Sequence, residues 1–363
     1  MTIGRIVISL TDPARRESLN TQEAPEASRR FPVSVFYPAE AGNELQQKSS
    51  VLSLFEPAVE RSAELFAMVG LAEERLRATA VPIYNDAPPA RTDKPLPVVV
   101  FAPGFGVDRD LYVRHIAALV QAGFLVVTVG ATYDTLFTVF PDGDVEMQSP
   151  RCSGQDFTDF PTLRELVRVR QADVQFTLTQ LPLWNEGESP LNGLFDLERI
   201  GLMGHSLGGA GVFGAAQADS QIRAVVLLDA SLHVLPSESP ISFPVLNVRQ
   251  EAASLEEMLQ TEMNDKVARA MAEGQQRLHD LAGADRCFVK IQGADHMTFS
   301  TIPALFQETE KLTRGQEAIQ AVTVAFLEEF AGGRAGRFAD FLAGGERPAQ
   351  VLEIDRDGHL SRP

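Results

Sequence analysis

The sequence has little of several features that would restrict its fold or its partners. Two of its 363 residues are cysteines, Cys152 and Cys287, and they lie too far apart to suggest a small disulfide-stapled domain. No stretch approaches the roughly 18 apolar residues of a membrane span, and Met1–Arg5 is not a basic segment leading into an apolar run. These absences predict a cytoplasmic protein with neither a transmembrane segment nor a signal peptide.

Positive charge is also scarce. The chain has 32 Lys and Arg residues against 49 Asp and Glu residues, a formal net charge of −17, and no block of like charge. Since proteins bind phosphate backbones through Lys and Arg, nucleic acid is not an expected partner. No group of Cys, His or carboxylate residues has metal-ligand spacing, so we expect neither a metal nor an organic cofactor. The sequence leaves the oligomeric state open.

From Leu96 onward, short apolar runs alternate with helical patterns, which is typical of βαβ units and a mostly parallel sheet. The apolar runs are Leu96–Ala102, Phe124–Val129, Arg199–Met203, Ala224–Asp229, Val245–Val248 and Cys287–Ile291. Helical patterns cover about 110–122, 161–183 and 315–330, and another helix follows Ser206. We therefore predict an α/β fold with helices on both faces of the sheet.

The remaining segments extend this single α/β domain, which we expect to cover residues 1–333. Two β-rich segments, 4–10 and 31–37, are expected as edge strands. Beyond Gly333 the sequence is polar and rich in Gly and Arg, so 334–363 is predicted to be a loosely ordered tail.

Two helical insertions interrupt the domain, at 44–95 and 251–283. The first is helical from about 51 to 77 and carries more apolar surface than a surface loop needs, Phe55 and Phe66 included. It is either a helix packed on the sheet edge or a cap beside a substrate pocket. In the second interpretation Phe55 and Phe66 contact substrate, and Met297 is a third candidate for this role.

The segment from Arg199 to Gly209 predicts a strand, a sharp turn and a helix, with G-x-S-x-G at the turn. This pattern is typical of a nucleophile elbow, in which Ser206 projects from the carboxyl edge of the sheet. The N–H of Leu207, at the start of the following helix, is placed to bind an oxyanion. The Gly-rich segment after the strand Leu96–Ala102 favours Phe105 as the second N–H donor, although a plain turn is the alternative.

His296 is the candidate base because, of the six histidines, it directly follows a late core strand. His233 is its rival, but it lies too close in sequence to Asp229. For the acid we favour Asp229, which ends a fully apolar strand where an unused charge would be costly. Glu251 is the alternative, since the acid of this fold can follow either of two neighbouring strands.

Several of these segments resemble the plasma-type platelet-activating-factor acetylhydrolase family of α/β-hydrolases and its bacterial relatives. The resemblance runs from about Phe31 to Phe330 and includes Pro-Gly-Phe-Gly, Gly-His-Ser-Leu-Gly-Gly, Val-Leu-Leu-Asp-Ala and Gly-Ala-Asp-His-Met-Thr-Phe. It implies an α/β-hydrolase fold, Asp229 as the acid and Phe105 as the second oxyanion donor. Pro103 departs from the family, many of whose members have histidine there.

The resemblance implies a serine ester hydrolase that acts on a small-molecule ester with a short acyl group. Polyester- and cutinase-type hydrolases share much of the same motif set and remain an alternative. Dehalogenases and epoxide hydrolases of this fold would carry Asp in place of Ser206. A binding protein without activity is a further alternative, but it would be expected to have lost Ser206, Asp229 or His296.

Overall fold

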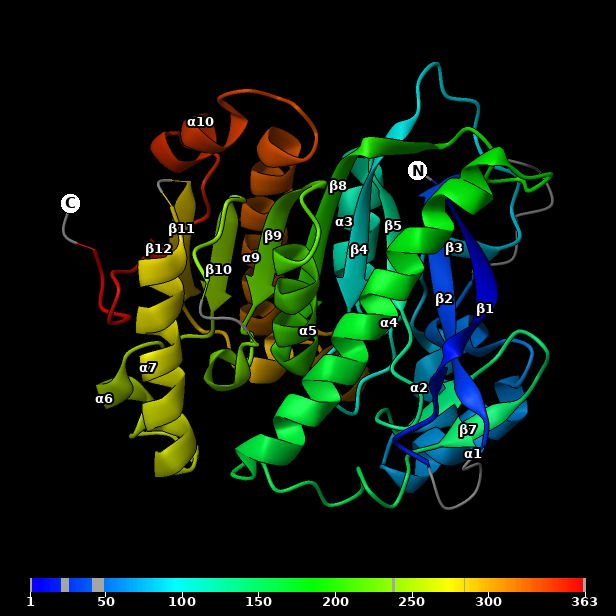
Figure 1. Ribbon diagram of the computed structural model, residues 1–363, viewed down its shortest axis with the longest axis horizontal. Helices are drawn as coiled ribbons and strands as arrows, with labels where there is room; N and C mark the ends of the chain where they lie inside the picture. The colour runs from blue at the N-terminus through cyan, green and yellow to red at the C-terminus, as the bar shows by residue number, and fades with distance from the viewer. Residues whose placement is uncertain (1, 21–25, 41–48, 237–238, 284, 362–363) are drawn as a thin grey trace.

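The computed structural model describes residues 2–20, 26–40, 49–236, 239–283 and 285–361, and within them one twisted sheet organises the chain (Figure 1). Its strands lie in the order β12 (Val351–Glu353), β11 (Arg286–Ile291), β10 (Val245–Arg249), β9 (Ile222–Leu228), β8 (Phe195–His205), β4 (Leu96–Ala102), β5 (Leu125–Val129), β2 (Ser28–Pro38), β1 (Ile3–Arg16) and β3 (Ile83–Asn85). The six strands from β11 to β5 pair in parallel. The alternation predicted from Leu96 onward is confirmed.

Helices cover both faces of this sheet, as expected when each strand is buried on both sides. One face packs on the helices α4 (Phe160–Glu186), α5 (Ser206–Gln217) and α7 (Asp265–Leu281), and the other on α3 (Val113–Gln121) and α9 (Glu310–Phe330) (Figure 1). Each face has its own apolar core, because neighbouring residues of a buried strand point to opposite sides. Val98 and Val100 belong to one core, and Val99 and Phe101 to the other.

The predicted helix over 51–77 is divided into shorter pieces. These are the 3₁₀ turn η2 (Val51–Phe55), α1 (Val59–Met68) and α2 (Glu73–Ala78). Pro57 lacks the N–H that a continuous helix needs, and Gly70 has φ +83°, which no helix accommodates. Residues 44–48, the start of the predicted insertion, lie outside the described residues.

Several further elements lie near the carboxyl ends of the central strands. The second insertion contains α6 (Leu255–Met258) and α7. A hairpin that the sequence analysis did not predict, β6 (Phe137–Val139) and β7 (Val145–Met147), lies beside α1 and α2 at the lower right of Figure 1. Three short helical pieces follow other strands: η3 (Leu232–Val234), η4 (His296–Phe299) and α8 (Ile302–Phe306).

The prediction of a loosely ordered tail beyond residue 333 is wrong. The tail forms α10 (Arg337–Ala343), and β12 pairs with β11 at the edge of the sheet. Phe338 and Phe341 are buried, and the Phe338 ring lies 5.2 Å from that of Phe326 on α9. A few apolar side chains in an otherwise polar segment are therefore enough to fix it on the domain.

We expect Phe341→Ala to lower the free energy of unfolding by about 3–4 kcal/mol, because it removes a large buried side chain and leaves a cavity. Leu183→Ala is the matched control, since Leu183 is 63% exposed and its loss should change stability by less than about 0.5 kcal/mol. Chemical denaturation at 25 °C measures both. Equal stability of Phe341→Ala and the wild type would show that the tail contributes nothing to the fold.

Candidate active site

Ser206 begins α5 directly after β8, where the chain turns too tightly for most residues. Its φ is +52°, a left-handed conformation that is uncommon for any residue but glycine. A Cβ on Gly204 would lie 2.6 Å from the carbonyl oxygen of Gly208, and one on Gly208 would lie 2.3 Å from that of Pro103. The two glycines of G-x-S-x-G are thus required by the close approach of strand, helix and loop.

His296 lies between Ser206 and Asp229 and is hydrogen-bonded to both. Its Nε2 is 3.0 Å from the Ser206 hydroxyl, and its Nδ1 is 2.6 Å from Asp229 Oδ2. The side chain of Glu251, the alternative acid, is exposed, and its backbone N–H donates to the carbonyl of Ala294. The structure therefore brings together Ser206, His296 and Asp229, and not Glu251.

A buried arginine accompanies Asp229, and sequence reasoning missed it. Arg249, at the end of β10, has an exposed fraction of 1%, and its guanidinium lies 3.3 Å from Asp229 Oδ1. Burial alone would raise the pKa of Asp229, but Arg249 and the hydrogen bond from His296 outweigh it and hold that pKa well below its usual range. A charge at the end of an apolar strand could have identified Arg249, as it identified Asp229.

Two backbone N–H groups of the segments around the elbow have no hydrogen-bond acceptor among the described residues. No described residue accepts a hydrogen bond from the N–H of Phe105 or of Leu207. The loop that carries Phe105 is close to the elbow, because a Cβ on Gly104 would lie 2.7 Å from Nδ1 of His205. Donors in these positions can stabilise negative charge on a carbonyl oxygen that Ser206 attacks.

A relay of hydrogen bonds through His205 connects the Phe105 loop with the His296 loop. The Gly104 N–H donates to Tyr112 Oη at 2.8 Å, and Tyr112 Oη lies 2.9 Å from His205 Nδ1. His205 Nε2 lies 3.0 Å from the carbonyl oxygen of His296, so Nε2 carries the proton and Nδ1 accepts one from Tyr112. Burial lowers the pKa of His205, which keeps this neutral tautomer.

The proposed nucleophile opens into an apolar cavity of about 420 Å³. Its wall includes Phe157 and the Met263, Val267 and Met271 side chains of the second insertion. The rival base, His233, also lies in this wall, with its Nδ1 2.9 Å from Met271 Sδ rather than near Ser206. The second insertion is therefore part of the site as well as of the core.

A second apolar cavity, of about 380 Å³, adjoins the first. Phe105, Val107 and Met297 line both cavities, so they form the boundary between them. Phe66 of α1 lines the second cavity, as a cap residue would.

Phe55 was expected to contact substrate, but it lines neither cavity. The η2 turn directs its ring inward, where it packs 4.9 Å from the Phe66 ring and 5.5 Å from that of Phe137. Phe137 belongs to the unpredicted hairpin and lines the second cavity. Phe55 thus supports the wall from behind.

The described residues offer neither a metal-binding cluster nor a membrane-spanning helix. They contain no group of three or more His, Cys, Asp or Glu side chains placed to hold a metal ion. None of their helices has the length and apolar character needed to cross a bilayer.

Known proteins resemble the chain in fold and in sequence. A ferulic acid esterase from Streptomyces cinnamoneus superposes with a TM-score of 0.74 at 21% identity, covering 98% of this chain and 96% of that one. This likeness confirms the predicted α/β-hydrolase fold. A probable 1-alkyl-2-acetylglycerophosphocholine esterase of Arthroderma benhamiae is 26% identical over 242 residues. That match covers 63% of this chain and 57% of the relative's length.

A family model described as PET hydrolase-like matches residues 158–354, which is more than half of the chain. The matched segment contains Ser206, Asp229 and His296, whereas the Phe105 loop and α1 precede it. The predicted resemblance to platelet-activating-factor acetylhydrolases thus holds at the level of serine esterases. The chain belongs to the PET hydrolase-like family, a family of carboxylic ester hydrolases.

Proposed function

We propose that the chain is a serine carboxylic ester hydrolase with Ser206, His296 and Asp229 as its catalytic triad. The observation that carries the proposal is the continuous hydrogen-bonded series from Asp229 through His296 to Ser206, beside an apolar cavity. A serine hydroxyl is activated when it is hydrogen-bonded to a base and that base is oriented by an acid. The family assignment supports the same class of reaction.

The proposed reaction transfers an acyl group in two steps. His296 takes the Ser206 proton as the hydroxyl oxygen attacks the ester carbonyl, and the N–H groups of Phe105 and Leu207 bind the resulting oxyanion. The proton then passes to the leaving alcohol, which leaves an acyl-enzyme. Water, deprotonated by His296, releases the acid and restores Ser206. Asp229 stays ionised and holds the imidazole in the required tautomer.

For the substrate we propose small esters with a short acyl group. The relative from Arthroderma benhamiae is named for an ester with an acetyl group, which supports this choice. We assign the acyl group to the cavity lined by Phe66 and the alcohol to the cavity bounded by Met263, Val267 and Met271. Met297, at the boundary, is proposed to contact both parts.

An aromatic polyester is the second candidate substrate. The matching family model favours it, and so do two adjoining apolar cavities that could hold the groups on either side of one ester bond. A panel of nitrophenyl esters from acetyl to palmitoyl, an acetyl-phospholipid and an aromatic polyester oligomer distinguishes the candidates. The substrate with the highest kcat/KM identifies the class.

We expect Ser206→Ala to lower kcat on every active ester by at least about 10⁴-fold, because no other group replaces the nucleophile. The variant should unfold at the same temperature as the wild type, since the hydroxyl contributes little to packing. A phosphonate ester should label wild-type Ser206 and no other serine in peptide mapping. Near-normal turnover by the folded variant would disprove the assignment.

Asp229→Asn should lower kcat by about 10⁴-fold, because an amide favours the wrong tautomer of His296. Glu251→Gln is the matched control and should leave kcat within about threefold of the wild type, since Glu251 is exposed and the imidazole Nδ1 is hydrogen-bonded to Asp229. Steady-state kinetics on one nitrophenyl ester measure both variants. A crippling effect of Glu251→Gln would reverse the choice of acid.

Phe66→Ala should move the preferred acyl chain to longer lengths, because it enlarges the proposed acyl cavity. In the wild type, kcat/KM should be highest from acetyl to butyryl and fall steeply by octanoyl. Phe55→Ala removes an equal ring behind the wall, so it should lower stability without moving this optimum. A wild-type preference for long chains, or a Phe66→Ala variant that only loses stability, would identify α1 as scaffold.

A further inference from the structure

Arg170 of helix α4 holds the Phe105 loop from behind. Its Nη1 donates to the carbonyl oxygen of Pro103, and its Nη2 lies 3.4 Å from that of Gly104. The side chain is almost fully buried, with an exposed fraction of 4%. One guanidinium therefore binds two successive carbonyl groups in the loop that supplies an oxyanion donor.

These contacts restrict the direction in which the Phe105 N–H points. The Gly104 carbonyl and the Phe105 N–H belong to one trans peptide plane, so they point in opposite directions. With the carbonyl turned toward Arg170, the N–H is turned to the other side of the loop. Gly104 and Phe105 line the cavity into which Ser206 opens. No described residue accepts a hydrogen bond from the Phe105 N–H.

The preceding peptide is held at both ends, which prevents the loop from turning as a unit. Its carbonyl, from Pro103, accepts from Arg170, and its N–H, from Gly104, donates to Tyr112 Oη at 2.8 Å. A rotation of the loop would therefore break contacts on two sides.

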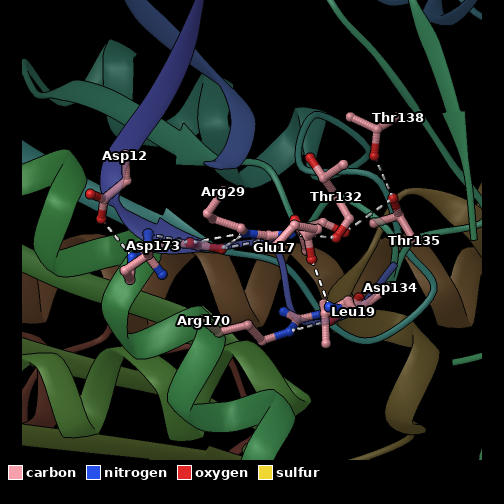
Figure 2. A network of polar contacts seen from close by, with 12 residues as sticks. Asp12, Glu17, Leu19, Arg29, Thr132, Asp134, Thr135, Thr138, Arg170 and Asp173 are labelled. Carbon is pink, nitrogen blue, oxygen red and sulfur yellow. Dashed lines mark hydrogen bonds and ion pairs between the residues drawn. The ribbon is translucent and has the colours of Figure 1, made fainter. Parts of the chain in front are cut away.

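Asp134 fixes the guanidinium that makes these contacts. Arg170 Nε donates to Asp134 Oδ2 at 2.7 Å, and Nη2 to Oδ1 at 2.6 Å, with Asp134 almost wholly buried (Figure 2). Such a two-point contact needs the planar fork of arginine, and a lysine ammonium cannot reproduce it together with two carbonyl contacts.

A second buried arginine in the same network has different partners. Arg29 pairs with Asp173 at 2.8 Å and with Glu17 at 3.0 Å, and it donates to the carbonyl of Thr132 (Figure 2). None of its described contacts is to the Phe105 loop. Arg29 is thus a matched control for a buried ion-paired arginine with a structural role.

We propose that Arg170, held by Asp134, is a positioning residue that sets the direction of the Phe105 N–H and thereby the stability of the oxyanion. The inference rests on the proposed function, since it assumes that Ser206 attacks an ester carbonyl. An oxyanion donor acts mainly in the transition state, so misdirecting it lowers kcat and leaves KM nearly unchanged.

The test compares kcat and KM, per folded molecule, for Arg170→Lys, Asp134→Asn and Arg29→Lys on one nitrophenyl ester. Loss of an oxyanion donor typically costs about 10²–10³-fold in kcat, so we expect about a 100-fold decrease for Arg170→Lys and about 10-fold for Asp134→Asn. KM should change by less than about threefold in both. Arg29→Lys should lose stability but keep wild-type kcat.

Normal kcat in folded Arg170→Lys, or the same loss in Arg29→Lys, would overturn the inference. If Arg170→Lys does not fold, the nearly isosteric Asp134→Asn replaces it in the test. A normal kcat in Asp134→Asn would then overturn the inference. Ser206→Ala is measured alongside to separate the two proposals. If Ser206→Ala keeps the kcat of the wild type, the proposed function itself is wrong. If Ser206→Ala loses activity but Arg170→Lys keeps the kcat of the wild type, only this inference is wrong.

Discussion

The close approach of β8, α5 and the loop after β4 is the constraint on which the candidate site depends. Three backbone segments meet here with no space for a Cβ on Gly204 or Gly208. This contact turns Ser206 to a positive φ, and it brings Ser206 and the Phe105 loop to one cavity. Backbone strain at Ser206 costs free energy that the surrounding packing must offset.

Buried charges maintain this arrangement. Asp229 is balanced by Arg249, and Asp134 by Arg170, each pair being almost inaccessible to solvent. A buried ion pair contributes little net stability, because both groups lose their hydration, but breaking one leaves an uncompensated charge and is costly. Such pairs therefore define geometry more than they stabilise the fold. Both pairs hold groups to which we assign a part in the chemistry.

The features that could be predicted from sequence are those carried by short segments. The apolar runs of the sheet, the elbow around Ser206 and the position of His296 after a late strand all depend on neighbours in the chain. The partners of Arg170, Arg249 and Tyr112 depend on contacts between distant segments, which one sequence does not specify. The ordered tail escaped prediction for a related reason, since buried aromatic rings fix it against a polar local sequence. The hairpin that contains Phe137 did carry a local signal, an Asp-Gly pair between two β-rich segments, which the sequence analysis overlooked.

In the proposed mechanism, catalysis and specificity share the residue Phe105. The backbone N–H of Phe105 is the proposed oxyanion donor, while its side chain lines both cavities and its ring lies 5.5 Å from that of Phe157. A substrate that contacts the Phe105 ring therefore contacts the same loop to which Arg170 and Tyr112 are hydrogen-bonded. A rigid loop keeps the N–H directed at the oxyanion while the ring adapts through its own side-chain rotations. In the proposed mechanism, the polar contacts behind the loop thus fix the oxyanion donor independently of the side chains that contact the substrate.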